Sequence, residues 1–411
     1  MRDPVAEILR FNRRFRGRYP HLLRRKVDLM CGSPFVFFRG TFHLFARDWV
    51  DHRFDAWPES SPLQKPEVRL CADLHGENFG TYGGEHHTAL YGINDFDEST
   101  SGRLDFDACR AATSLLLAGS TRGLLLRSAA AGAHAFVEMY MDAIDGSPKP
   151  FRSPLIRQLI RTAERAKRSE FIGKRTELRG GRRRFAGEKF FRLTDAHEKQ
   201  ARRLHEDYRS RTKIRKECGP DFFEVEDVSG RIAGCGSLGR LRYVVLVRGE
   251  DPKEAREVIL EYKEALPSAL DEALGRGIDL KARRNRAQAV VEATRCFQVQ
   301  SDPFLGHAID GDQSFQVRQV GPREFRLDGA ALTGGRQFRE TASSYGAYLA
   351  AAHRRANGNQ ALRVLRDAVG KRREAFVRRT MSFAMAYAEQ VDEDWRALLK
   401  AREQVTRKLS E

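Results

Sequence analysis

The sequence lacks the features that define several broad classes of protein. None of its 411 residues falls in a run of about eighteen apolar residues, so we expect no membrane-spanning helix. The N-terminus, MRDPVAEILRFNRRF, has no apolar signal-peptide core, and we therefore expect a cytoplasmic protein. The six cysteines are scattered without CxxC spacing, which argues against a structural zinc site and against a disulfide framework.

The composition is that of a folded protein with an uneven positive charge. Hydrophobic residues make up 41% and charged residues 31%, and the length predicts more than one lobe. The net charge is +17, and residues 161–216 hold 20 Lys and Arg against 8 Asp and Glu. Such a segment can face nucleic acid, an acidic substrate or a membrane surface, or can be a solvated helical face. No zinc-finger, RRM or helix-turn-helix pattern favours nucleic acid.

Two short loops carry the residues on which the functional prediction depends. The first reads CADLHGENFG and the second NDFDEST, and each follows an apolar run that we expect to be a strand. Metal-assisted phosphoryl transfer needs an acidic residue at the attacking hydroxyl and oxygen ligands that hold magnesium against the phosphates. We therefore assign Asp73 to the acceptor, Asn78 and Asp95 to the metal, and Asp97 to the metal or to a helix cap.

The spacing of these residues matches two kinase motifs. Asp73-x-x-x-x-Asn78 has the spacing of the protein kinase catalytic loop, and Asp95-Phe96-Asp97 stands where those enzymes carry Asp-Phe-Gly. Because Asp, Asn and Gly concentrate in turns, one loop alone is weak evidence, and two loops in order are more specific. The sequence around His75 is similar to the H-G-D-x-H-x-x-N loop of aminoglycoside and choline phosphotransferases. We expect His75 to organise the loop by hydrogen bonding.

A β-rich region follows from Phe222 and has the order of a kinase nucleotide lobe. A glycine-rich turn between the first two strands would cover the triphosphate. A third strand ends in Lys263, which would contact the α- and β-phosphates, and the next helix carries Glu292 as its partner. The glycine-rich turn or the lysine alone is weak evidence for a nucleotide lobe, since tight turns and solvated strand-end lysines are common. The turn residues are Gly234, Gly236, Ser237 and Gly239.

The rest of the chain reads mostly as helix. Residues 3–16 predict an amphipathic helix, and helices are also expected to about residue 210 and from Arg336 onwards. The aromatic run SPFVFFRG is expected to pack in the core, with Arg39 able to reach a phosphate or carboxylate. DAWPESSPLQKPE is a connector. Asp107 lies in the first turn of a helix, where it complements the helix dipole; in kinase-like folds, an aspartate on the equivalent helix also supports the catalytic loop.

Six motifs in order resemble the uncharacterised family known as domain of unknown function 2252. They are SPFVFFRG, DLHGENFG, NDFDE, GCGSLG, LEYKEA and SDPFLG, and the resemblance extends from about residue 20 to 356. The family pattern has a glycine where this chain has Ala72. It also has a longer Arg-Gln-x-x-Asp-x-Lys run where this chain reads RQVGPRE, so we assign no role to the segment after Gln319.

We predict an α+β, two-lobed protein-kinase-like fold in circularly permuted order, which is acceptable when the original termini lie close together. Residues 1–215 would form the helical catalytic lobe, 216–325 the β-rich nucleotide lobe, and 326–411 the helices that complete the first lobe. Lys263 and Asp95 should then lie within about 10 Å, given metal and charge-pair distances.

The predicted function is phosphotransfer from ATP, dependent on Mg²⁺ or Mn²⁺, to a small-molecule hydroxyl. The acceptor class rests on analogy with the aminoglycoside-type loop. Three alternatives stay open. They are a nucleotide-binding pseudokinase, a nucleotidyl (AMP) transferase that binds its nucleotide in a reversed pose, and a nucleic-acid-associated protein that uses the basic segment 161–216.

Overall fold

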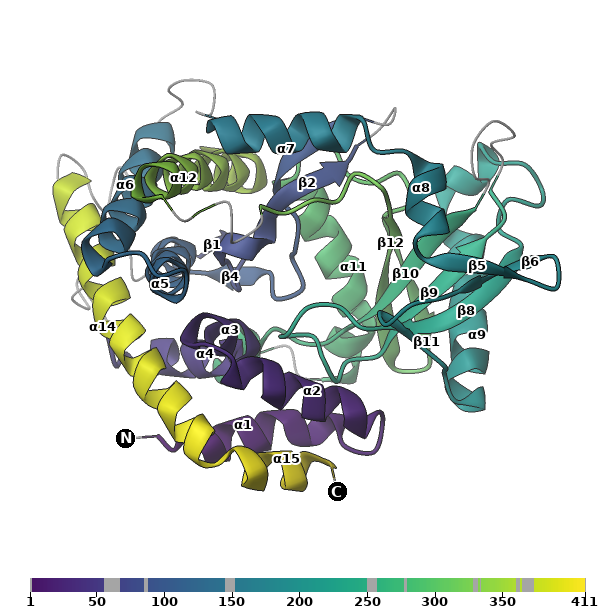
Figure 1. Ribbon diagram of the computed structural model, residues 1–411, viewed down its shortest axis with the longest axis horizontal. Helices are drawn as coiled ribbons and strands as arrows, with labels where there is room; N and C mark the ends of the chain where they lie inside the picture. Colours follow the sequence, from purple (N-terminus) through teal and green to yellow (C-terminus); the bar gives the residue numbers. More distant parts are fainter. Residues whose placement is uncertain are drawn as a thin grey trace.

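A computed structural model describes residues 2–54, 67–84, 88–144, 152–249, 257–276, 279–327, 332, 334–359, 363 and 373–410. Helices form one side of the molecule and an antiparallel sheet the other (Figure 1). The α+β class is therefore confirmed. Among the described residues, no helix is both long and apolar enough to cross a membrane.

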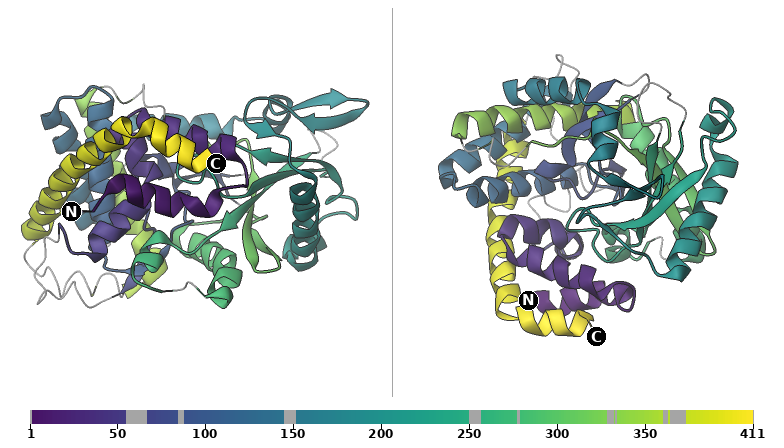
Figure 2. Two further views of the ribbon diagram at one scale, coloured as in Figure 1. Left: turned by 90° about the horizontal axis from the view of Figure 1, so that it is seen from below. Right: turned by 45° about the vertical axis from the view of Figure 1, so that its right-hand side comes forward.

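The helical part is built from both ends of the chain around one hydrophobic core. The N-terminal helix begins at a proline after Asp3, whose carboxylate accepts from the backbone N–H groups of Val5 and Ala6, as an N-cap does. The last helix packs against the first two, so the termini lie on the same side (Figure 2). The helices are α1 (Pro4–Asn12), α2 (Pro20–Cys31), α3 (Pro34–Gly40), α4 (Phe42–Val50), α5 (Asp105–Thr121), α6 (Leu126–Ile144), α7 (Pro154–Glu164), α12 (Gly335–Asn357), α14 (Arg373–Lys400) and α15 (Arg402–Ser410).

Two small strand pairs carry the predicted loops. The strands expected before them are confirmed as β1 (Val68–Leu70), which pairs with β4 (Thr100–Gly102), and β3 (Ala89–Ile93). The partner of β3 is β2 (Phe79–Gly83), a strand that the sequence reading did not predict. Because β2 begins where the first loop ends and β3 ends where the second begins, this hairpin brings the two loops together.

The large sheet has the order β11-β12-β10-β9-β8-β7. Helix α9 (Asp195–Arg211) covers one face, where Leu260 and Tyr262 of β10 are buried with it. Because side chains alternate along a strand, Glu261 and Lys263 face the opposite side. Helix α11 (Leu280–Phe297), with the short α10 (Ala269–Ala273) before it, packs against β10–β12 and α12. The strands are β7 (Phe190–Phe191), β8 (Val225–Arg231), β9 (Arg242–Val247), β10 (Val258–Ala265), β11 (Gly306–Asp310) and β12 (Gln313–Val320).

The region before this sheet differs from the prediction of continuous helix. After α8 (Arg168–Gly173), a projecting hairpin of β5 (Thr176–Arg179) and β6 (Arg182–Phe185) follows (Figure 1). Its Gly-Gly turn has φ values of 57° and 76°, which glycine adopts without strain. Strand β7 pairs with β8 in the large sheet, and α9 packs against that sheet. The predicted connector spans residues 55–67, of which 55–66 lie outside the described residues.

The close crossing of α6 and α12 gives a test of the fold. A Cβ atom at Gly346 would lie 2.1 Å from the backbone oxygen of Phe136. We expect Gly346→Ala to lower the free energy of unfolding by about 1–3 kcal/mol, because rigid backbone must move to accept the methyl group. Chemical denaturation measures the loss. Gly173→Ala is the matched control, since its Cβ meets nothing within 4 Å; equal effects of the two changes would contradict this packing.

Candidate active site

One face of α5 fixes the backbone of the first loop. The Asp107 carboxylate accepts from the N–H groups of Cys71 and Ala72, each at 2.8 Å, and Ser114 Oγ accepts from Gly76 N–H at 3.0 Å. These contacts bracket Asp73, so the loop is held on both sides of it. Of the two roles considered for Asp107, loop support is the one that its contacts show.

A buried hydrogen-bond chain holds Asp107 in turn. His353 Nε2 of α12 lies 2.9 Å from Asp107 Oδ2, and the Tyr140 hydroxyl of α6 lies 2.9 Å from His353 Nδ1. All three side chains are buried. An ionised carboxylate only accepts, so Nε2 donates to Asp107, and in a neutral ring Nδ1 then accepts from the tyrosine. Three helices thus position the first loop through one carboxylate.

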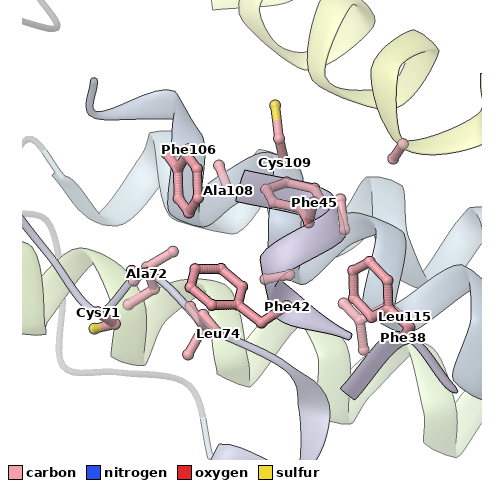
Figure 3. Packing of buried hydrophobic residues seen from close by; sticks show 14 of the residues in the cluster. Phe38, Phe42, Phe45, Cys71, Ala72, Leu74, Phe106, Ala108, Cys109 and Leu115 are labelled. Atoms are coloured by element: carbon pink, nitrogen blue, oxygen red, sulfur yellow. The ribbon is translucent and has the colours of Figure 1, made fainter. Parts of the chain in front are cut away.

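Ala72 lies in the left-handed region, with φ of 67°, which costs a non-glycine residue roughly 1–2 kcal/mol. Glycine, which the resemblance described above implies at this position, adopts this conformation without that cost. The side chains of Cys71, Ala72 and Leu74 are buried beside Phe42 and α5 (Figure 3). The strained turn therefore buries the neighbours of Asp73, whose own side chain stays 22% exposed.

Asp73 is held by a buried cation that sequence reasoning did not identify. Its Oδ1 accepts from Arg110 Nη2 at 2.7 Å, and the same nitrogen donates to the Phe38 carbonyl at 2.9 Å. Burial raises the pKa of Asp73 to about 6, against the opposing effect of Arg110. A carboxylate that titrates near neutral pH suits a group that orients or deprotonates a hydroxyl.

The second loop meets the strand lysine. Lys263 Nζ lies 3.6 Å from Asp95 Oδ1 and also forms an ion pair with Asp97. Burial alone would raise the pKa of Asp95, but Lys263, Arg326 and Arg242 lower it to about 2. The expected proximity of Lys263 and Asp95 is therefore present. Asp97 is not a helix cap, since the next helix begins only at Asp105.

Glu292 is not the partner of Lys263, and that prediction is wrong. Its side chain is exposed and accepts from Gln288 Nε2 at 3.0 Å, one turn away on α11. The helix exists where expected, but its packing turns position 292 to solvent. Arg286 of the same helix faces the second loop instead and donates to the Asp97 carbonyl at 2.6 Å. The acidic partners of Lys263 come from the second loop.

The glycine-rich turn packs against the N-terminal helices. Gly234 and Gly239 have φ values of 70° and 103°, and a Cβ at Gly236 would lie 2.9 Å from the Arg39 carbonyl oxygen. Ser237 Oγ donates to the Ala233 carbonyl at 3.0 Å. That the turn covers phosphate stays a prediction.

Two cations hold the turn in place. Lys26 Nζ donates to the Gly236 carbonyl at 3.1 Å. Arg240, at the end of the turn, lies 3.6 Å from Asp97 and also pairs with Glu98. The turn and the second loop are thus joined directly.

Three other predicted residues serve the first loop. Asn78 Oδ1 accepts from the His75 backbone N–H at 2.8 Å, and the Asn78 carbonyl accepts from Asn94 N–H at 2.9 Å, beside Asp95. Burial, together with nearby arginines, lowers the pKa of His75 well below its usual value, so its ring is neutral. Arg39 Nη2 lies 2.8 Å from Glu77, within the same loop.

A magnesium site here would need phosphate oxygens to complete it. Within the described ranges, no group of three His, Cys, Asp or Glu side chains could hold a metal ion. In such a site Asp95 and Asp97 would supply the carboxylates, and Asn78 Oδ1, which already accepts from the His75 N–H, would have one further lone pair to offer.

The basic segment 161–216 is partly neutralised by ion pairs with acidic residues outside it, such as Arg184–Asp227 and Arg203–Asp310.

Comparisons with known proteins bear on the family alone. A family model described as "Uncharacterized protein conserved in bacteria (DUF2252)" matches residues 18–401. No curated protein and no solved structure matches the chain.

The environment of Asp73 predicts a specific pH dependence. Its carboxyl ionises near 3.8 when unfolded and near 6 when folded, so folding opposes ionisation. Relative to Asp73→Asn, the wild-type free energy of unfolding should therefore fall as the pH rises from about 4 to about 6 and then level off. Urea denaturation of both proteins across this range measures the difference. A difference that grows with pH would contradict the assignment.

Proposed function

The chain belongs to this bacterial family, and on that premise we propose that it is an ATP- and Mg²⁺-dependent phosphotransferase of circularly permuted kinase-like fold. The observation that carries the proposal is the meeting of Lys263 with Asp95 and Asp97, which lie far apart in sequence. Phosphoryl transfer needs this combination, because a lysine must bind phosphate where carboxylates hold the metal.

The order of elements in the β-rich part supports a nucleotide lobe. A glycine-rich turn joins β8 to β9, the lysine lies on the neighbouring strand β10, and helix α11 follows before β11 and β12. This is the order of phosphate-covering loop, strand lysine and helix that kinases use. In this chain the two loops that carry Asp73 and Asp95 come before the β-rich part, whereas in kinases the nucleotide lobe comes first. This exchanged order is what we call the circular permutation.

The sheet face that carries Lys263 also suits a polyanion. The buried carboxylate of Glu261 lies among Arg231, Arg242 and Arg318, all within 4 Å. Arg318 also pairs with Glu324, and Lys263 pairs with Asp95 and Asp97, so these cations are balanced by carboxylates of the sheet and of the second loop. Guanidinium and ammonium groups gathered on one face could also donate to the phosphate oxygens of an anionic ligand such as ATP.

The residues divide into four roles. Lys263 would bind the α- and β-phosphates, and the turn at 234–239 would cover them. Asp95, with Asn78 and Asp97, would hold Mg²⁺, which neutralises charge on the phosphates. Asp73, positioned by Arg110, would orient and deprotonate the acceptor hydroxyl. A small-molecule acceptor and a cytoplasmic location are part of the proposal, the former by the likeness of the first loop to those of aminoglycoside phosphotransferases.

Binding measurements on four variants test these roles. Lys263→Ala should weaken MgATP binding by about 1.5–3 kcal/mol, because a charge-assisted contact to phosphate is lost. Asp95→Ala should remove the dependence on Mg²⁺, whereas Asp73→Ala should leave binding nearly unchanged while abolishing turnover. Glu292→Ala is the control, because its side chain points to solvent. Calorimetric titration provides the affinities.

The metal requirement offers a simpler readout. ATP should raise the melting temperature with Mg²⁺ and much less with EDTA, because the triphosphate charge needs the cation beside Asp95. Equal shifts in both conditions would count against the site.

A further inference from the structure

The segment that leaves the sheet after β12 crosses to the β2–β3 hairpin. Thr81 N–H donates to the Phe325 carbonyl at 2.8 Å, and Phe325 N–H donates to Thr81 Oγ1 at 2.9 Å. The next residue, Arg326, forms an antiparallel bridge with Gly80. An arginine that sequence reasoning left without a role therefore lies against the strand that continues the first loop.

Gly80 leaves room for the side chain of this arginine. A Cβ atom at Gly80 would lie 3.3 Å from Arg326 Cγ and 2.8 Å from Asn94 Nδ2. The arginine stem thus passes over the hairpin beside Asn94, which immediately precedes Asp95. The positive charge of Arg326 affects both loops. It lowers the pKa of Asp95, on which only burial and Lys263 have larger effects. Together with burial, Arg39 and Arg110, it also lowers the pKa of His75.

Arg326 differs from the other cations of the site in having no acidic partner among the described residues. Lys263 pairs with Asp95 and Asp97, and Arg110 pairs with Asp73. Arg326 is exposed, and within the described part of the chain no hydrogen bond or ion pair engages its guanidinium. A guanidinium presents parallel N–H donors that match two oxygens of a phosphate.

We propose that Arg326 binds the terminal phosphate of the nucleotide, an assignment that rests on the proposed function. Lys263 approaches Asp95 from the sheet, whereas Arg326 lies against the β2–β3 hairpin, which continues the first loop that carries Asp73. The phosphate nearest the acceptor is the terminal one, because that phosphate is transferred. Arg326 therefore distinguishes a nucleoside triphosphate from a diphosphate at this site.

Affinities for two nucleotides test this assignment. Arg326→Gln should weaken MgATP binding about tenfold or more, as expected for a lost charge-assisted contact, and should leave MgADP binding unchanged. Arg326→Lys, which keeps the charge without the paired donors, should show a smaller loss. Arg127→Gln, at an exposed position on α6, removes the same charge away from the site and should change neither affinity. Calorimetric titration measures each, with melting temperatures as a check on folding.

The possible results separate this inference from the function on which it rests. Equal losses for MgATP and MgADP would overturn the terminal-phosphate assignment, as would wild-type affinity for both in Arg326→Gln. A wild-type protein that binds neither nucleotide would refute the nucleotide site itself, and the assignment of Arg326 with it.

Discussion

Ion pairs between the second loop and the sheet hold the two parts of this protein in register. Lys263 reaches Asp95 and Asp97, and Arg240 reaches Asp97 and Glu98. Lys263 and Arg240 are largely buried, and a buried cation that loses its partner costs about 3–5 kcal/mol. The acidic loop and the basic ends of the strands therefore specify one another's positions. The placement of the glycine-rich turn relative to Asp95 depends on this match.

Helix α5 holds the first loop, which carries Asp73, in a corresponding way. Positions 107, 110 and 114 lie on one face of the helix and supply a carboxylate, a guanidinium and a hydroxyl to the first loop. They hold a turn that includes the strained Ala72, and such strain persists only where surrounding contacts over-determine it. The contacts of His353 and Tyr140 extend this support into α12 and α6. Both loops are thus fixed by residues outside the motifs.

Local sequence patterns predicted several of the helices and strands around the site. The positions of side chains within the site depend on contacts between residues that are distant in sequence. The strands before both loops, the strand that carries Lys263 and the helix that begins near Asp107 follow from apolar periodicity and turn residues. Which side of α11 faces the sheet could not be predicted, because it depends on packing against residues that are distant in sequence. Glu292 lies on the side that faces solvent. Arg110 could have been suspected, because it is the one basic residue of α5, whose other charged residues are the two aspartates of its first turn. Arg326 could not, because its place depends on a bridge to Gly80.

Transfer of label from ATP tests the central claim most directly. Purified protein would be incubated with Mg²⁺, a metabolite extract, and ATP that carries the label at either the γ- or the α-phosphate. The account predicts that the γ label moves to a small-molecule product while the α label stays in ADP, and that Asp73→Ala transfers neither. Movement of the α label to a product would indicate nucleotidyl transfer instead. That result, or the absence of any transfer by the wild-type protein, would contradict the assignment as a phosphotransferase.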